Sequence, residues 1–353
     1  MKGDLTTTRK AEHISICLNQ DVSYKTIKTG FEQIQLTHCA LPEINFEEIN
    51  PQISFLGKTL SFPLMITGMT GGFEGAQTFN QQVAEVCQAM QIAFGLGSLR
   101  PALENPELLN SFQIAPHLRK QIPIMANIGA AQIIREEPRQ RIQQLVEQLE
   151  VDALAVHLNP LQEILQPEGD QHFRGVLNGI EQLVKKMTIP IVVKETGAGI
   201  SRKVAERLIG VGVSIIDVSG AGGTSWAAVE HFRVQDQALA ARFWDWGIPT
   251  VQCLQELSSF TQLQVIASGG IRSGLDVAKA CVLGAHLAGA ALPFLKALYQ
   301  QGQAGLLQLI QQWRQEFKIT MFLTGCTRVS ELDQVAYHGN QSQDLKNLQS
   351  QLG

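Results

Sequence analysis

The stretch LQVIASGGIRSGLDVAKACVLGAHLAGAALPF, residues 263–294, holds the pattern that decides the fold. It contains two short apolar runs, 263–270 and 285–291, separated by a helical pattern over 273–284. The first run ends in two glycines and the second in small residues. A strand, a helix and a second strand at this spacing predict a βαβ unit in a parallel sheet.

Six further apolar runs precede this unit, and most lie roughly 25–35 residues apart, the length of a strand, a helix and their loops. They cover residues 62–67, 91–98, 122–129, 152–159, 189–195 and 214–220. Such runs are typical of parallel strands covered on both faces. Eight units predict a closed α/β TIM barrel, (β/α)8, rather than a doubly wound open sheet, which would also alternate strands and helices.

The chain of 353 residues is predicted to form one domain. Residues 1–60 would form an N-terminal arm with a strand or two, 61–300 the barrel, and 301–353 a C-terminal helical extension. The longest interval between strands contains residues 225–250, SWAAVEHFRVQDQALAARFWDWGIPT, which we expect to lie as a loop and helix over the barrel.

Composition limits the classes of partner. The net charge of −4 gives no sign of a polyanion-binding surface, so no nucleic-acid partner is predicted. Six cysteines without a C-x-x-C pair indicate reduced thiols rather than disulfides or a zinc site. The N-terminus lacks an apolar signal core and no run is long enough to span a membrane, so we expect a soluble cytoplasmic protein without a membrane partner.

Polar and glycine-rich residues follow the predicted strands at the end where TIM barrels carry out their chemistry. Backbone N–H groups in the loops after the last two strands predict a phosphate site. These loops resemble the FMN-binding half of flavin-dependent barrels, which by position implies phosphate contacts from Gly270, Ile271, Arg272, Ala291 and Leu292. Many relatives carry Gly-Arg in the second loop, so one expected cation is missing here.

Lys194 ends the apolar run 189–195, where a buried lysine is costly unless it is paired. One interpretation is a cation beside the electron-rich edge of a flavin, where it stabilises the reduced ring. The alternative is a solvent-exposed contact with Glu195. The first three strands end in small hydrogen-bonding residues that would meet the ring, namely Thr67, Gly68, Met69, Thr70, Ser98 and Asn127.

The motif HLNPLQE, residues 157–163, crowds four polar side chains onto the end of a buried strand. Alternation places Ala155, His157 and Asn159 on one face, which suits a barrel interior that opens into a pocket. Pro160 ends the strand and would put Gln162 and Glu163 on the following loop. His157 alone would more often be a core histidine, but its polar neighbours favour a functional site.

A single carboxylate, that of Glu163, suits Mg²⁺ shared with substrate phosphates, and this predicts a diphosphate substrate. Candidate cations for the diphosphate are Arg9, Lys10, His13 and Arg100. A solvated N-terminal tail is the alternative for Arg9 and Lys10.

Together the motifs resemble those of type 2 isopentenyl diphosphate isomerase, an FMN-dependent family. They occur in family order over nearly the whole chain and are RKAEH (9–13), TGMTGG (67–72), GSLR (97–100), HLNPLQE (157–163), KETGAG (194–199), SGAGGTSW (219–226) and SGGIRSG (268–274). HLNPLQE and SGAGGTSW are the specific ones, whereas SGGIRSG alone indicates only a flavin- or phosphate-binding barrel.

The resemblance implies interconversion of isopentenyl and dimethylallyl diphosphates with reduced FMN as the acid–base group, Mg²⁺, and NADPH or NADH as reductant. It implies a homotetramer or larger homo-oligomer. Gln162 and His157 would be catalytic and Glu163 the metal ligand, while Ser219 and Thr224 would contact the flavin phosphate and ribityl chain. The implied substrate-binding residues are Arg9, Lys10, His13, Ser98, Leu99, Arg100, His157, Asn159 and Gln162. Trp226 would be a wall of the prenyl pocket or a core residue.

Two other functions stay open at this stage. An FMN oxidoreductase acting on a small 2-hydroxy acid shares the last two loops, but SGAGGTSW lacks the histidine base and the arginine that such enzymes carry. A non-catalytic flavin- or phosphate-binding module would not need Glu163. Such a module would be yellow without responding to Mg²⁺.

Overall fold

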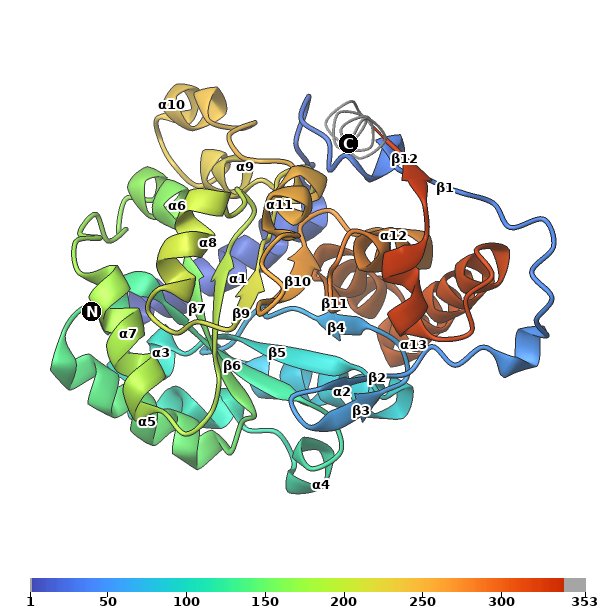
Figure 1. The fold of residues 1–353 in the computed structure, drawn as a ribbon. Helices are drawn as coiled ribbons and strands as arrows, with labels where there is room; N and C mark the ends of the chain where they lie inside the picture. The colour runs from blue at the N-terminus through green and yellow to red at the C-terminus, as the bar shows by residue number, and fades with distance from the viewer. Residues whose placement is uncertain (1, 340–353) are drawn as a thin grey trace.

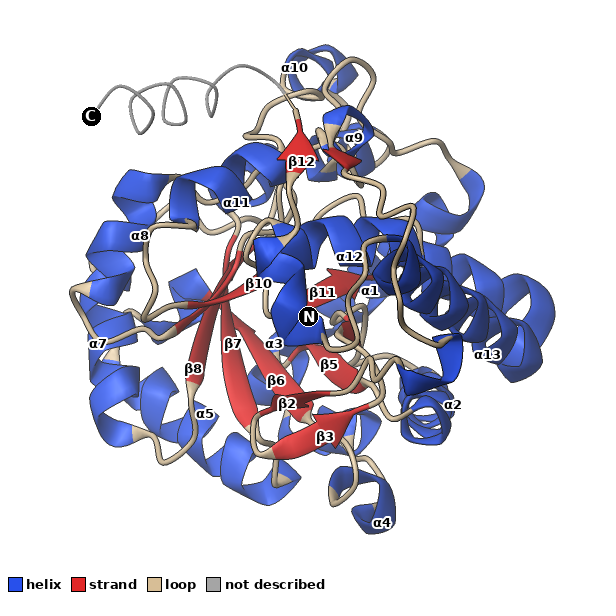
Figure 2. Ribbon diagram, turned by 45° about the vertical axis from the view of Figure 1, so that its right-hand side comes forward, coloured by secondary structure: helices blue, strands red, loops and turns tan. Residues whose placement is uncertain are grey.

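Eight parallel strands form a closed barrel in the computed structural model, which describes residues 2–339. They are β4 (Leu64–Ile66), β5 (Ala93–Ser98), β6 (Ile124–Gly129), β7 (Ala153–Leu158), β8 (Ile191–Glu195), β9 (Ile215–Asp217), β10 (Gln264–Ser268) and β11 (Leu287–Ala290). Each lies within one of the predicted runs, and β4 pairs with both β5 and β11 to close the barrel. Helices surround the strands in Figure 2. The predicted TIM barrel is therefore confirmed.

The longer of the surrounding helices bury an apolar stripe. In α5 (Glu136–Leu149), for example, Ile142, Leu145 and Leu149 are buried at helical spacing while the intervening polar side chains face outward. The others are α2 (Ala76–Met90), α3 (Arg100–Glu104), α4 (Pro116–Arg119), α6 (Pro160–Leu165), α7 (Val176–Lys186), α8 (Arg202–Ile209), α11 (Thr250–Leu257), α12 (Gly274–Val282) and α13 (Leu292–Leu323).

The interior of the barrel has an apolar layer at its amino end. Alternate residues of a strand face the same way, and each of the eight barrel strands contributes to this layer. The members include Met65, Met125, Ala153, Val192, Ile215, Ile266 and Leu287. A hairpin of β2 (Ile53–Phe55) and β3 (Lys58–Leu60) packs Phe55 and Leu60 into the same cluster and so covers this end.

The opposite, carboxyl end is covered by segments from far apart in the sequence. They are α1 (Lys2–Asn19), which the sequence analysis did not predict as a helix, and α9 (Trp226–His231), followed by α10 (Gln237–Arg242). α1 contacts α9, which contacts α10 in turn, and Figure 1 shows α9 and α10 next to each other. The loop and helices expected over the barrel between its sixth and seventh strands are thus present.

The C-terminal region continues directly from the barrel. The boundary predicted after residue 300 falls inside α13, which changes direction at Gly302, where φ is 66°. Further on, β12 (Tyr337–His338) pairs with β1 (Gln35–Leu36) of the N-terminal arm. Residues 340–353 of the predicted extension lie outside the described residues. Among residues 2–339, none of the helices is both long and apolar enough to cross a membrane.

Candidate active site

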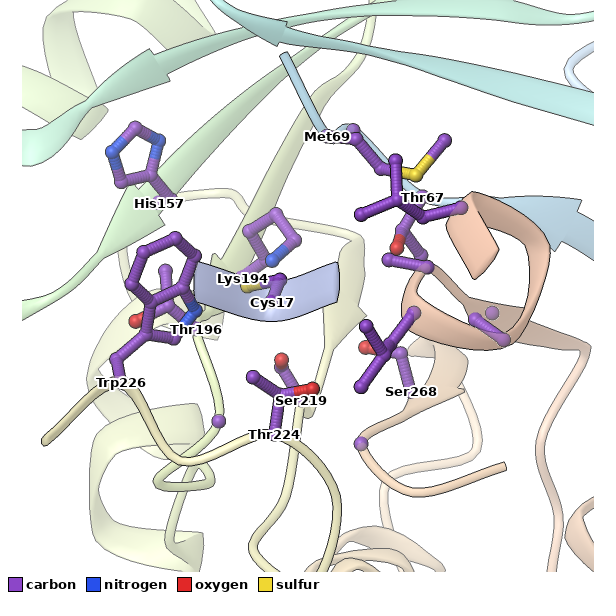
Figure 3. Close-up of a pocket in the computed structure, with 18 of the residues that line it drawn as sticks. Cys17, Thr67, Met69, His157, Lys194, Thr196, Ser219, Thr224, Trp226 and Ser268 are labelled. Carbon is purple, nitrogen blue, oxygen red and sulfur yellow. The ribbon is translucent and has the colours of Figure 1, made fainter. Parts of the chain in front are cut away.

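A pocket opens at the carboxyl end of the barrel, and residues of α1, of the strand ends and of the loops that follow them line it (Figure 3). Many of the predicted site residues meet there. These are Lys10, His13, Thr67, Gly68, Met69, Ser98, Asn127, His157, Gln162, Lys194, Ser219, Thr224, Gly270, Arg272, Ala291 and Leu292. Trp226 also lines the pocket, and its ring lies edge-on to His13 at 5.1 Å between centroids.

The floor of the pocket is a polar layer directly above the apolar layer of the barrel. Asn127, His157 and Lys194 each follow an inward-facing apolar residue by two positions, so the strand pleat turns them inward as well. His157 Nδ1 lies 2.7 Å from Asn127 Oδ1. Burial, together with the nearby Lys194 charge, holds the pKa of His157 well below its usual value. The imidazole is therefore neutral, with its proton on Nδ1 and a lone pair on Nε2.

Lys194 points into the pocket, whereas the neighbouring Glu195 points out of the barrel. Lys194 Nζ donates to the backbone oxygen of Glu195 at 2.5 Å. The Glu195 carboxylate accepts the N–H groups of Thr196 at 2.6 Å and Gly197 at 2.7 Å, and also that of Ala198. The two side chains do not form the solvent-exposed contact considered from the sequence. Instead, Glu195 holds the loop that supplies Thr196 and Gly197 to the pocket wall.

The loops after β10 and β11 supply the expected donors for a phosphate. Gly269 and Gly270 both have positive φ, 97° and 75°, a conformation that glycine adopts at little cost. Ala291 precedes α13, and no side chain caps the first N–H groups of that helix. Arg272 lines the same end of the pocket, but the side chain of Ile271 is fully buried in the core. Ile271 therefore offers only its backbone.

The donor set fits FMN. Backbone N–H groups and Arg272 stand at the phosphate end, while Lys194 and the Asn127 amide stand at the barrel floor. Met69 and Leu292 add apolar surface in the same pocket. This combination matches a cofactor with an anionic tail and a flat ring that carries polar edges.

The motif 157–163 folds differently from the predicted loop. Pro160 begins α6, so Gln162 and Glu163 lie in the first turn of a helix rather than on a loop. The sequence prediction was wrong here because proline, which ends a strand, also suits the first position of a helix. Asn159 Nδ2 donates to Gln162 Oε1 at 3.1 Å and to Glu163 Oε1 at 2.9 Å.

Glu163 is buried beside the pocket rather than in its lining. Its Oε2 accepts hydrogen bonds from Gln166 Nε2 and from the Asp170 N–H, both at 2.7 Å. Among the described residues, Oε1 accepts a hydrogen bond only from Asn159, which leaves a lone pair that a cation can use. Residues 2–339 contain no group of three or more His, Cys, Asp or Glu side chains able to hold a metal. A metal at Glu163 would thus need ligands from a bound anion.

Several other predicted residues lie behind the lining. Leu99 is fully buried at the start of α3, and Thr70 is buried with no hydrogen-bond partner for Oγ1. Arg9 pairs with Glu168 at 3.6 Å. Arg100 Nη1 lies 3.4 Å from Asp170 Oδ2, and its Nε donates to Glu104 at 2.9 Å.

Glu230 is an acidic residue of the site that the sequence analysis missed. It is fully buried, accepts a hydrogen bond from His13 Nε2 at 2.9 Å, and lies 3.4 Å from Gln162 Nε2. Burial alone would raise its pKa, but the bonds and charges of His13 and Arg233 outweigh this and lower it. Glu230 is therefore ionised. The available signal was a glutamate inside the apolar run 226–232.

Arg233 joins three segments that cover the pocket. It reaches Glu230 Oε2 at 2.7 Å, Glu168 Oε1 at 2.9 Å and Glu12 Oε2 at 3.0 Å. These carboxylates belong to α9, to the segment after α6, and to α1. The arginine therefore fastens α1 over the pocket.

Other lining residues also escaped the sequence analysis because they are small or apolar. They are Ile14, Cys17, Thr196, Gly197, Ser268, Gly269, Gly289, Ala290 and Leu295. Most of them lie within motifs already quoted, next to residues that were predicted. Ile14, Cys17 and Leu295 lie outside these motifs, and burial raises the pKa of the Cys17 thiol to about 12.

Comparisons with known proteins agree with this fold and site. The family described as FMN-dependent dehydrogenase matches residues 110–338. The structure of a mandelate oxidase with benzoyl-formic acid has a TM-score of 0.65 to this chain and 19% identity, covering 96% of this chain and 98% of that one. Identity at this level supports the fold alone. The protein is of the FMN-dependent α/β-barrel class.

Nearer relatives define the family within that class. An isopentenyl-diphosphate delta-isomerase of Methanothermobacter thermautotrophicus is 44% identical over 93% of this chain and 92% of its own length. One from Nostoc sp. is 43% identical over 95% of both chains. The chain belongs to the isopentenyl-diphosphate delta-isomerase family, and with its FMN-dependent barrel to the type 2 branch.

Replacing Arg233 with methionine should loosen α1. The change removes the ion pair of the buried Glu230 with Arg233 and the link to Glu12, and breaking a buried pair is strongly destabilising. We expect backbone amide hydrogen exchange in residues 9–19 to accelerate by about tenfold or more. Arg202→Met, at a half-exposed arginine on α8, is the matched control and should leave that exchange unchanged. Equal exchange in both variants would refute the fastening role.

Proposed function

We propose that this isomerase interconverts isopentenyl and dimethylallyl diphosphates in the pocket at the carboxyl end of the barrel. The observation that carries the proposal is the meeting of Gln162, His157 and Lys194 with the cations of α1 around one cavity. Bound FMN, in its reduced form, would supply the acid–base chemistry that adds and removes protons at the alkene.

Residues of the barrel floor would hold the flavin. Lys194 would place its charge beside the ring and favour the reduced, electron-rich state. Asn127, Thr67 and Ser98 offer hydrogen-bonding groups for polar ring edges, and Ser219 and Thr224, which also line the pocket, would contact the ribityl chain. The loop residues Gly270, Arg272 and Ala291 would bind the phosphate.

The diphosphate of the substrate would bind between α1 and the motif 157–163. Lys10 lines the pocket, and its charge acts on His157 together with that of Arg100. Burial first, then the charges of Arg9 and Arg100, lower the pKa of Lys10 to about 8. Crowded cations of this kind favour a multiply charged anion. Mg²⁺ would use the free lone pair of Glu163 Oε1 and complete its coordination with diphosphate oxygens and water.

Gln162 would lie beside the reacting carbons. Its Oε1 accepts a hydrogen bond from Asn159 and its Nε2 lies 3.4 Å from Glu230, so the amide is oriented from both sides. Trp226, Ile14 and Leu295 supply apolar surface in the same pocket for a prenyl group. An ionised Glu230 beside Gln162 would stabilise positive charge that develops on the alkene.

Further parts of the proposal concern the setting of the enzyme. The reductant is NADPH or NADH, the protein is cytoplasmic, and it assembles as a homotetramer or larger. The cysteines at 17, 39, 87, 253, 281 and 326 are all free thiols. Free thiols are typical of a reducing compartment and so support the cytoplasmic location.

Oxidation of a small 2-hydroxy acid is the weaker alternative. The mandelate oxidase likeness supports it only at the level of fold. The relatives at 41–44% identity are isomerases, and the loop 219–226 carries neither histidine nor arginine.

The decisive experiment is an anaerobic assay with FMN, Mg²⁺, NADPH and isopentenyl diphosphate, followed by proton NMR. We expect dimethylallyl diphosphate to appear, and to be absent when FMN or the reductant is omitted. If the protein binds FMN and can be reduced but converts none of the substrate, the proposal is wrong. The oxidoreductase alternative would then be favoured.

Replacing Glu163 with glutamine should raise the Mg²⁺ concentration needed for half-maximal activity by on the order of 10-fold, because a neutral amide is a poor Mg²⁺ ligand. The measurement is a Mg²⁺ titration of the NMR assay. Glu181→Gln, at a partly exposed glutamate of α7, is the control and should titrate like the unmodified enzyme. If the Mg²⁺ titration of Glu163→Gln is unchanged, Glu163 is not a ligand of the metal.

Substrate affinity should fall as the pH rises above about 8. Below that value Lys10 is already protonated, whereas above it the bound diphosphate must draw a proton onto the lysine. The KM should therefore rise by up to about tenfold for each pH unit above the pKa. Lys10→Arg keeps its charge over this range and should flatten the profile. Identical slopes for the two proteins would exclude Lys10 as the titrating group.

A further inference from the structure

Asp217 is a buried carboxylate directly behind the polar floor of the pocket. It ends β9, is 1% exposed, and does not belong to the pocket lining. The barrel register pairs Asp217 with Lys194 of β8. Both residues face inward because each follows an apolar interior residue, Ile215 or Val192, by two positions. A carboxylate thus stands beside the lysine of β8.

The two carboxylate oxygens of Asp217 have different surroundings. Oδ1 accepts a hydrogen bond from Ser268 Oγ at 2.6 Å and from the Ser219 N–H at 3.2 Å. Oδ2 has no hydrogen-bond partner among the described residues and lies 3.9 Å from Lys194 Nζ. The serines therefore fix the carboxylate, and its unpaired oxygen is directed at the ammonium group.

This arrangement balances the Lys194 charge at the point where it would act on the flavin. Lys194 Nζ donates to the Glu195 carbonyl oxygen at 2.5 Å and lies 3.9 Å from Asp217 Oδ2. Burial raises the pKa of Asp217 above its usual value, although Lys194, Ser268 and the Ser219 N–H act in the opposite direction. The negative charge of an ionised Asp217 would offset part of the field of Lys194 in the pocket.

We propose that Asp217 is a positioning residue that holds the Lys194 ammonium group and, through its charge, makes the bound flavin harder to reduce than Lys194 alone would make it. The proposal rests on the proposed binding of FMN beside Lys194. Lys194 of β8 and Asp217 of β9 would then form a charge pair that sets the reduction potential of the cofactor, in addition to any contribution to the stability of the fold.

The test compares Asp217→Asn with the unmodified holoenzyme. Asparagine keeps the shape and can still accept from Ser268, but it removes the negative charge. The reduced flavin carries extra negative charge, so the variant should bind reduced FMN about tenfold more tightly relative to oxidised FMN. For a two-electron couple this corresponds to a midpoint potential about 30 mV more positive. The potential is measured by anaerobic reduction against a reference dye.

The matched control is Asp152→Asn. Asp152 also pairs with a lysine, Lys58 at 2.7 Å, but at the amino end of the barrel. Its loss should leave the flavin potential unchanged. Asp217→Thr, which is neutral and suited to a strand, is made in parallel so that a folded variant is available if the asparagine variant does not fold.

The outcomes separate the possible roles. If Asp217 is purely structural, its replacement would weaken the binding of oxidised and reduced FMN equally, and the midpoint potential would stay the same. A protonated Asp217 would also give equal potentials. Either result overturns the proposal, as does a more negative potential. Because the potential is read from the flavin itself, it stays informative even if the isopentenyl diphosphate assay shows no conversion.

Discussion

Closure of the eight-stranded barrel is the constraint on which the rest of the structure depends. Once the strands close, every second residue of each strand faces the interior of the barrel. That interior is too narrow for a water-filled channel, so side chains fill it in layers. The lower layer is apolar and closed by Phe55 and Leu60. The layer above it carries Asn127, His157 and Lys194, and these polar groups become the floor of the pocket because no further layer covers them.

The polar floor of the pocket and the cations above it are accompanied by acidic side chains that balance their charge. Lys194 is offset by Asp217, and the cations that α1 and Arg100 bring are offset by Glu163, Glu168 and Glu230. These acids accept hydrogen bonds from backbone N–H groups or side-chain donors, which stabilises charge in a largely buried site. The same network that would receive an anionic substrate also fixes α1 in place.

Much of the fold could be predicted, because continuous apolar runs that end in glycine or polar residues indicate parallel strands directly. The residues at strand ends, such as Thr67, Asn127 and Lys194, were predicted for the same reason. The helix α1 was not, since RKAEH is equally typical of a solvated terminus. Its position depends on Glu168 and Glu230, more than 150 residues away in the sequence.

The sequence by itself determined the barrel, its polar end and the family of the chain, because these follow from local periodicity and contiguous motifs. Only the tertiary structure decided which charges are paired. Lys194 and Asp217, or His13 and Glu230, have no spacing that identifies them as partners, and they meet because barrel register and the covering helix place them together. A partner distant along the chain is chosen by packing, and packing is fixed only when the barrel closes.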